Sequence, residues 1–124
     1  PDVTFINLQY VDYENDLNEI KEDLGVTVHN FNDLDHFNDI DDVAALSAAL
    51  DIVVSTKTTV PSISAGVGTS TKLAIWRPSS INNILYKPVG PLVDKFERDT
   101  FEPWENIFNL IAKEIFEIKK KKKL

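Results

Sequence analysis

The sequence has no cysteine and no methionine among its 124 residues. Without cysteine the chain offers no disulfide, no thiolate metal ligand and no cysteine nucleophile. It also lacks any apolar run near the roughly 20 residues that a membrane-spanning helix needs, and it shows no signal peptide. We therefore expect a cytoplasmic protein with no membrane partner. Because methionine is missing and the chain starts at Pro1, we also expect a fragment of a longer polypeptide.

Basic residues are in the minority, since 13 lysines and arginines stand against 20 aspartates and glutamates, giving a net charge of −7. Contacts to phosphate backbones need a basic surface, so this composition argues against nucleic acid as a partner. The five consecutive lysines at 119–123 are interpreted as the solvated end of a helix, where cations suit the negative pole of the helix dipole, rather than as a tail for nucleic acid or membranes. The length predicts a single domain, residues 1–124, with a hydrophobic core of its own.

Strand and helix signals alternate along the amino-terminal part of the chain. The first segment, 3–10, is rich in β-branched and aromatic residues, which favours a strand. Apolar residues then recur at helical spacing up to Leu24, with Asp12 as the expected cap and Gly25 as the expected stop. The next predicted elements are a strand at 26–31, an acidic turn at 32–42 and an alanine-rich helix at 41–50.

The remaining part of the chain continues the alternation. A continuous apolar run at 51–55 is typical of a strand covered on both faces. A long helix opens at Glu102 and Pro103, because apolar residues from Trp104 to Ile118 recur on one face. Between them we predict a short helix near 60–67, a strand at 71–76, a loop at 77–91 and an edge strand at 92–97.

This order of elements predicts an α/β fold. We expect a three-layer, mostly parallel, Rossmann-like sheet of about five strands, flanked by helices and joined by right-handed crossovers. Ligands of such sheets bind beyond the carboxyl ends of the strands. The places to search for a site are therefore the loops at 9–12, 31–37, 55–59 and 76–80.

The segment TKTTVPS (56–62) is the first candidate for a ligand site, because it follows the apolar strand directly. Backbone amides at the start of the next helix attract anions, Thr58, Thr59 and Ser62 add hydroxyl groups, and Lys57 adds positive charge. Neither GxxxxGK[ST] nor GxGxxG is present. The alternative is structural: one threonine caps the helix, and small residues at 65–68 allow close packing against the sheet.

Other candidate residues carry weaker signals. Arg77, beside Trp76 at a strand end, would hold a phosphate or stack on a base, but a surface arginine next to a core tryptophan fits equally well. His36 lies among aspartates and suggests a cation or acid–base site. The acidic run also precedes a helix, where aspartates are expected, so we predict no metal. His29 is interpreted as an ordinary strand histidine.

Three segments in order resemble the carboxyl-terminal domain of heptosyltransferase-like GT-B glycosyltransferases. They are FINLQY (5–10), DDVAALSAALDIVVS (41–55) and TTVPSISAGVGTSTKLAIW (58–76). The form most similar is the one fused behind tetratricopeptide repeats, which is related in layout to O-linked N-acetylglucosamine transferases. The resemblance is a diffuse pattern rather than one diagnostic motif, and it covers about four-fifths of the chain.

The resemblance implies binding of the diphosphate of a nucleotide-diphosphate sugar, with no metal or other cofactor and with an acceptor that the sequence does not identify. Carried over by position, the donor-binding residues are Ser55, Thr58 and Thr59, together with Gln9. The chain departs from the family pattern at two places, because Lys57 replaces an aspartate and Ser62 replaces a histidine. These departures favour the alternative of a non-catalytic α/β binding or structural module derived from the same fold.

The resemblance also implies that one strand and one helix of the family domain, and the whole acceptor domain, are missing. The fragment is then inactive alone, although the parent protein is expected to be an enzyme. The missing strand belongs in the middle of the sheet. We therefore expect either that the remaining strands close the gap or that an exposed sheet edge allows self-association. A receiver-like signalling domain fits less well, because Gln9 and Tyr10 stand where that class has an acidic pair.

Overall fold

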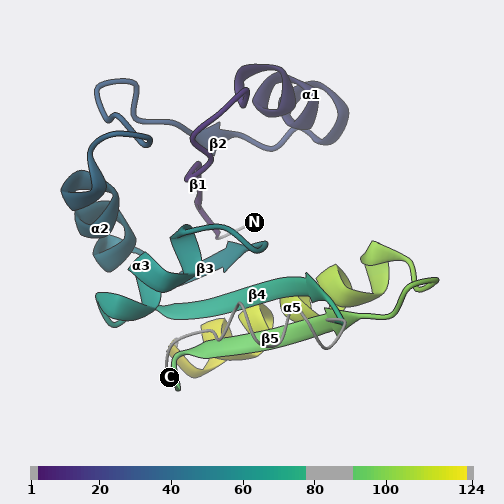
Figure 1. Ribbon diagram of the computed structural model, residues 1–124. Coiled ribbons are helices and arrows are strands. Elements are labelled where there is room, and N and C mark those ends of the chain that lie inside the picture. The colour runs from purple at the N-terminus through teal and green to yellow at the C-terminus, as the bar shows by residue number, and fades with distance from the viewer. Residues whose placement is uncertain (1–2, 78–90, 123–124) are drawn as a thin grey trace. The chain divides into compact units, whose positions relative to one another are not determined.

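The computed structural model describes residues 3–77 and 91–122, which form the nine labelled helices and strands of Figure 1. In chain order these are β1 (Phe5–Ile6), α1 (Glu14–Leu24), β2 (Val28–His29), α2 (Ile40–Ala49), β3 (Ile52–Ser55), α3 (Val60–Gly66), β4 (Ser70–Trp76), β5 (Val93–Arg98) and α5 (Trp104–Lys122). Among these residues no helix has both the length and the apolar character needed to cross a membrane.

The α/β class with parallel strands is confirmed, but the expected five-stranded Rossmann-like sheet is not what forms. The five strands fall into two hydrogen-bonded sheets, β1-β2 and β3-β4-β5, and every pair within them is parallel. One cause is local. The Asn7 side-chain oxygen accepts a hydrogen bond from the Gln9 amide at 2.9 Å, which turns the backbone away from a ladder. The predicted strand at 3–10 is therefore only two residues long.

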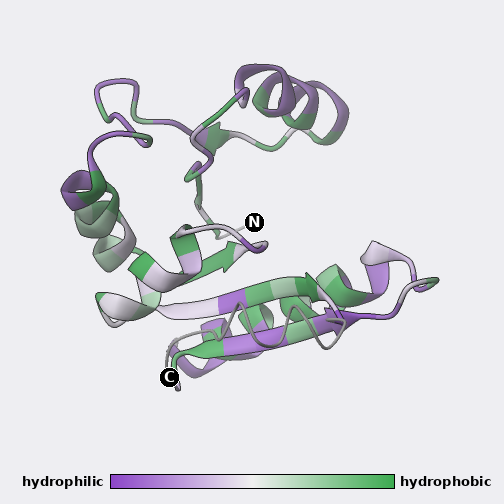
Figure 2. Cartoon of the chain, in the orientation of Figure 1, coloured by the Kyte–Doolittle hydropathy of each residue, from purple (hydrophilic) through white to green (hydrophobic). Residues whose placement is uncertain are grey.

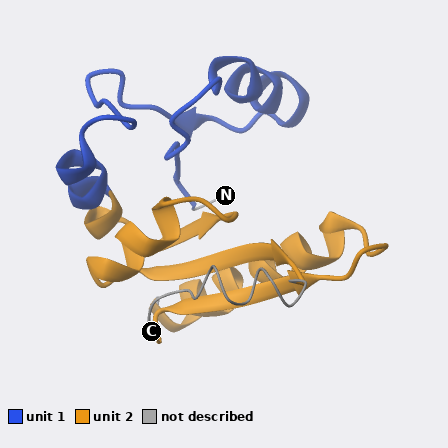
Figure 3. Ribbon diagram, in the orientation of Figure 1, with its two compact units in different colours: residues 1–46 blue, residues 47–124 orange. Residues whose placement is uncertain are grey.

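The chain divides into two compact units, and Figure 3 distinguishes them by colour. The amino-terminal unit comprises residues 1–46 and the carboxyl-terminal unit comprises residues 47–124. Each unit has its own parallel sheet.

In the amino-terminal unit, helix α1 ends as the sequence predicts. Gly25 adopts the left-handed conformation, with φ of 64°, and its amide bonds to the carbonyl of Lys21. The helix begins differently, since its N-cap is Tyr13, which makes no capping bond through its side chain, and Asp12 lies one residue earlier at φ 45°. The prediction of an aspartate cap is therefore wrong. No residue of α1 is buried.

Helix α2 begins at an aspartate, as its sequence suggests. The side chain of Asp39 accepts a hydrogen bond from the amide of Asp42 at 3.0 Å, which satisfies one of the free amides of the first turn. Asp41 and Asp42 place negative charge at the positive end of the helix. The cap thus fixes where the preceding acidic loop joins the helix.

In the carboxyl-terminal unit, β4 is the central strand, and its successive side chains contact two different helices. Thr71 of β4 contacts Ser64 of α3 through their hydroxyl oxygens, 2.6 Å apart, whereas Lys72 bonds to Glu114 of α5. Because neighbouring residues of a strand point to opposite faces, α3 and α5 cover opposite faces of this sheet. The unit is therefore three layers thick, as expected for the class.

One hydrophobic cluster of the carboxyl-terminal unit lies between the sheet and α5. Ala74, Ile107 and Ile111 are buried together, and the side chains packed on them are Phe96, Trp104 and Ile115. The apolar spacing of the long helix is confirmed in this contact. The helix continues through Lys119–Lys122, so the lysine run is helical as far as residue 122.

The two outer strands of the three-stranded sheet differ in character. At one edge lies β5, which corresponds to the predicted edge strand at 92–97 and carries two adjacent charged pairs, Asp94–Lys95 and Glu97–Arg98; Figure 2 shows much of it as hydrophilic. At the other edge β3 consists of Ile52, Val53 and Val54 followed by Ser55. Charge protects an edge against further pairing, and only β5 has that protection within its own strand. The predicted loop at 77–91 lies almost wholly outside the described residues.

Candidate functional site

The loop from Ser55 to Ser62 lies at the carboxyl end of β3, as expected. Ser55 pairs with Leu73 of the parallel strand β4, so the next residues leave the sheet at its carboxyl edge and turn into α3. The structure thereby brings together the predicted donor-site residues of this loop, which are Ser55, Lys57, Thr58, Thr59 and Ser62.

Two of these hydroxyl groups hold the loop itself together. The Ser55 hydroxyl donates to the carbonyl of Thr56 at 3.0 Å, and its oxygen lies 3.3 Å from that of Thr58. Thr58 also accepts a hydrogen bond from the amide of Val60 at 3.3 Å. Thr58 thus bonds to the first residue of α3, but the N-cap residue itself is Thr59, whose side chain makes no capping bond, so the expected threonine cap is not found.

The backbone amides of the loop are largely used within the loop. The amide of Thr58 donates to the carbonyl of Thr56 at 2.9 Å, and the amides of Ser62 and Ile63 both donate to the carbonyl of Thr59. Pro61 has no amide hydrogen to offer. An anion bound here would therefore depend on side chains more than on backbone amides.

The remaining hydroxyl groups are open to solvent. Thr59 and Ser62 are exposed, and within the described part of the chain neither hydroxyl makes a hydrogen bond. Lys57 is exposed as well and brings positive charge beside them. The expected packing role of the glycines is not found, because a side chain added at Gly66 or Gly68 would meet nothing within 4 Å.

Arg77 follows β4 and is paired with acidic side chains of the neighbouring segment. Its guanidinium lies 3.0 Å from the carboxylate of Asp99 and 4.0 Å from that of Glu97. These carboxylates compete with any phosphate for the same cation, although an exposed pair of this kind contributes only about 0–1 kcal/mol.

Trp76 is not a core residue, because 64% of its side chain is exposed. Its ring stacks on Trp104, with centroids 6.4 Å apart and planes at 21°, and the guanidinium of Arg98 lies 4.8 Å from the Trp104 ring. Arg98 is fixed in turn by the carbonyl oxygen of Glu102. The sequence alone does not indicate this cluster, because its members come from three separate elements, β4, β5 and α5.

Gln9 belongs to the amino-terminal unit and is engaged there. Its side-chain amide donates to the carbonyl of Val11 at 2.9 Å. Its own carbonyl accepts from the side chain of Asn7, which also reaches Asn30 at 2.9 Å. Gln9 is thus part of a local amide network of the amino-terminal unit.

The histidines give no sign of a metal centre. Both ring nitrogens of His36 are buried without a hydrogen-bond partner, whereas His29 is exposed on β2. In residues 3–77 and 91–122 no group of three histidine or carboxylate side chains is placed to hold a metal ion. Asp35 instead serves the loop: hydrogen bonds from the side chain and amide of Asn38, and from the amide of Phe37, lower its pKa.

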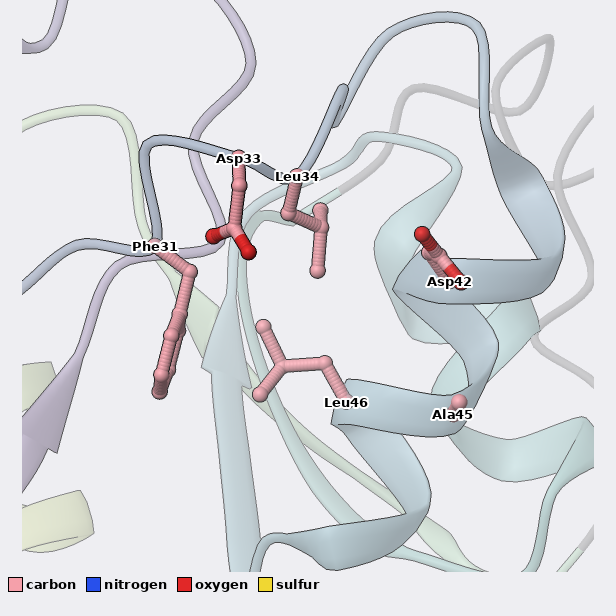
Figure 4. Close-up of a pocket in the computed structure, with 6 residues that line it drawn as sticks. All are labelled: Phe31, Asp33, Leu34, Asp42, Ala45 and Leu46. Atoms are coloured by element: carbon pink, nitrogen blue, oxygen red, sulfur yellow. The ribbon is translucent and has the colours of Figure 1, made fainter.

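A shallow cavity of about 290 Å³ lies in the amino-terminal unit, beside the loop at 31–37 that the sequence indicates as one of the places to search (Figure 4). It lies between the loop after β2 and helix α2. The residues that line it are Phe31, Asp33, Leu34, Asp42, Ala45 and Leu46. Its walls therefore combine apolar side chains with two carboxylates.

Comparisons with known proteins give one relative and no family. The chain is 34% identical over 116 residues to the protein FlbA of Caulobacter vibrioides, a match that covers 90% of this chain and 19% of FlbA. The chain thus spans about a fifth of the length of that relative. No known family matches the sequence, and no solved structure matches the fold.

Proposed function

We propose that this chain is the donor-binding part of a glycosyltransferase of the heptosyltransferase-like GT-B type, and that it is inactive alone. The observation that supports the proposal is the pair of solvent-facing hydroxyl groups of Thr59 and Ser62, beside Lys57, at the carboxyl edge of a parallel sheet. Parallel α/β sheets bind their ligands at this edge. The proposed ligand is the diphosphate of a nucleotide-diphosphate sugar.

The chemistry of sugar transfer determines which groups such a site needs. When the sugar leaves, negative charge develops on the diphosphate, and hydrogen-bond donors and cations aimed at it stabilise the transition state. Thr59 and Ser62 supply donors and Lys57 supplies charge. Ser55 and Thr58 contribute by fixing the turn that presents them.

A second function, a non-catalytic binding or structural module, is favoured by specific contacts. The amides of Thr58, Ser62 and Ile63 are already bonded within the loop, and Arg77 is paired with Asp99. A site prepared for phosphate usually keeps such groups available. This alternative predicts that the loop binds no nucleotide diphosphate.

A titration followed by heteronuclear NMR separates the two. Uridine, guanosine and adenosine diphosphates are added to the isotope-labelled chain, and we expect one of them to shift the amide signals of residues 55–62. In the double variant Thr59→Ala with Ser62→Ala the affinity falls roughly tenfold or more, since hydrogen bonds to charged groups contribute about 1.5–3 kcal/mol each.

The matched control is the double variant Thr27→Ala with Thr100→Ala, which removes two exposed hydroxyl groups elsewhere. It keeps the affinity of the unmodified chain. If none of the diphosphates shifts residues 55–62, the donor-binding proposal is wrong and the non-catalytic module is supported. If the control pair weakens binding as much as the test pair, the loop is not the site.

A further inference from the structure

Charge is divided very unevenly between the two units. Residues 1–46 contain twelve aspartates and glutamates but a single lysine, Lys21, whereas residues 47–124 contain eight acidic and twelve basic residues. Clustered charge of one sign attracts partners of the other sign and raises their rate of association. The amino-terminal unit therefore favours a basic partner.

The cavity of this unit collects both kinds of group that such a partner would contact. Asp33 and Leu34 come from the loop, and Asp42 and Leu46 come from α2, with Phe31 closing one side (Figure 4). Within the described residues the carboxylates of Asp33 and Asp42 make no hydrogen bond or ion pair. They differ in this respect from the neighbouring aspartates of the loop.

The neighbouring aspartates are used to build the loop. Asp35 accepts hydrogen bonds from the amides of Phe37 and Asn38, and Asp39 caps α2 through the amide of Asp42. The loop is thus fixed by its own contacts, and the two carboxylates at the cavity are left for another molecule. This division of roles distinguishes the cavity from a merely acidic turn.

Most apolar side chains of this unit are not buried in a hydrophobic core. Val43 is the one hydrophobic residue of the described part of this unit that is buried, while the side chains of Phe31, Phe37 and Ile40 are 44%, 64% and 60% exposed. Exposed apolar surface bordered by polar residues marks a site of association. The cavity lies within this surface, since Phe31 is one of its walls.

We propose that this cavity binds a basic segment of a partner protein, with one apolar side chain in the cavity and lysine or arginine residues beside it paired to Asp33 and Asp42. The volume of about 290 Å³ is just below the range of about 300–1,000 Å³ for small-molecule sites, and it suits one side chain. This binding is independent of the donor site proposed above.

Electrostatics selects this occupant over the others. Nucleic acids and anionic membranes carry the same sign of charge as the unit and are repelled. A second copy is opposed by its net charge of −7, but its lysine run at 119–122 is itself basic, so a dimer is an outcome that the test below distinguishes. A basic peptide segment is attracted at long range and supplies the apolar contact at short range.

The test uses the full chain and the blocked pentapeptide KKFKK as the probe. NMR titration is expected to shift signals of residues 31–46, and the affinity is expected to fall at least about threefold between about 50 and 300 mM salt. The double variant Asp33→Asn with Asp42→Asn, in which both residues are exposed, loses about fivefold or more in affinity. The peptide KKAKK, which lacks the anchor, binds more weakly than KKFKK.

The matched control is Asp16→Asn with Glu19→Asn on α1, which removes the same charge away from the cavity. It keeps the affinity within roughly twofold, because exposed charges at a distance are screened. Equal loss in both double variants, equal binding of KKAKK, or equal binding of the acidic peptide EEFEE overturns the proposal. So does a dimer of the chain that covers residues 31–46, because a second copy is then the occupant.

Discussion

Lys72 on β4 and Glu114 on α5 form an ion pair, with 2.8 Å between ammonium and carboxylate, at the interface of sheet and helix. Asp94 of β5 adds a second carboxylate at 2.5 Å. The side chain of Lys72 is only 4% exposed, whereas those of Asp94 and Glu114 are 54% and 48% exposed. The buried member of the group is therefore the cation. Replacing Lys72 and replacing its two acidic partners consequently change the stability of the fold by different amounts.

Removing the two carboxylates destabilises the fold more than removing the lysine. In Asp94→Asn with Glu114→Gln the buried ammonium group loses its counter-charges, which costs about 3–5 kcal/mol. In Lys72→Met an apolar chain of similar length fills the same space, and the carboxylates remain solvated, so the cost is about 1 kcal/mol or less. Urea unfolding of the three proteins measures the difference, and the reverse order would contradict this account.

The same group makes stability dependent on pH on the alkaline side. Desolvation by itself lowers the pKa of Lys72, but hydrogen bonds and charge from Asp94 and Glu114 outweigh it and raise the pKa above its ordinary value of 10.5. A lysine whose pKa is raised by folding stabilises the folded state fully below pH 10.5. This stabilisation is lost as the pH rises through the pKa that the lysine has in the folded state. The free energy of unfolding should therefore fall more steeply above pH 10.5 in the unmodified protein than in Lys72→Met. Parallel curves for the two proteins would exclude this role.

Glycine is required at position 25 because of the backbone conformation there, and not because a side chain would lack space. A side chain there meets nothing within 4 Å, but φ is +64°, so Gly25→Ala costs about 1–2 kcal/mol in the stability of the end of α1. Gly66 is equally open and has no such φ, so Gly66→Ala is neutral or stabilises by about 0.4–1 kcal/mol. Amide hydrogen exchange of the two helices measures both effects, and similar losses at the two glycines would contradict the conformational argument.

Neighbouring apolar residues of α5 differ sharply in importance. Ile111 is 2% exposed in the contact with Ala74, so Ile111→Ala destabilises the protein by about 2–5 kcal/mol through lost burial and an added cavity. Leu110 is 52% exposed, and Leu110→Ala changes stability by about 0.5 kcal/mol or less. Guanidinium unfolding of both variants gives the comparison. A large loss at Leu110 would show that this side of the helix is covered by something else.

Local signals predicted the order of the elements and the helices well, whereas the strands expected at 3–10 and 26–31 are only Phe5–Ile6 and Val28–His29. The apolar spacing up to Leu24, the stop at Gly25 and the long helix from Trp104 all correspond to observed structure, because each depends on residues close in sequence. The partition of five strands into two sheets was not predictable in the same way. It depends on which strands pair, which composition does not reveal.

Prediction of the site from the sequence meets the same limit as prediction of the fold. Sequence position correctly placed Ser55, Thr58 and Thr59 in one loop at a strand end, but it did not indicate that the amides of Thr58 and Ser62 are bonded within the loop. The loop at 31–37 was among the predicted places for a site, but the contribution of 42–46 to the cavity was not predicted, because the separation of the two segments in sequence follows no period. The aspartates there had a sufficient explanation as the start of a helix.

The opposite signs of the two units have a practical consequence for handling the protein. An overall value of −7 suggests ordinary acidic behaviour, yet residues 47–124 carry a surplus of four positive charges, most of them near the end of α5. Chromatographic retention depends on local patches rather than on the sum. The protein should therefore adhere to cation-exchange as well as anion-exchange resin near neutral pH, and cleavage between the units would send the two halves to different columns.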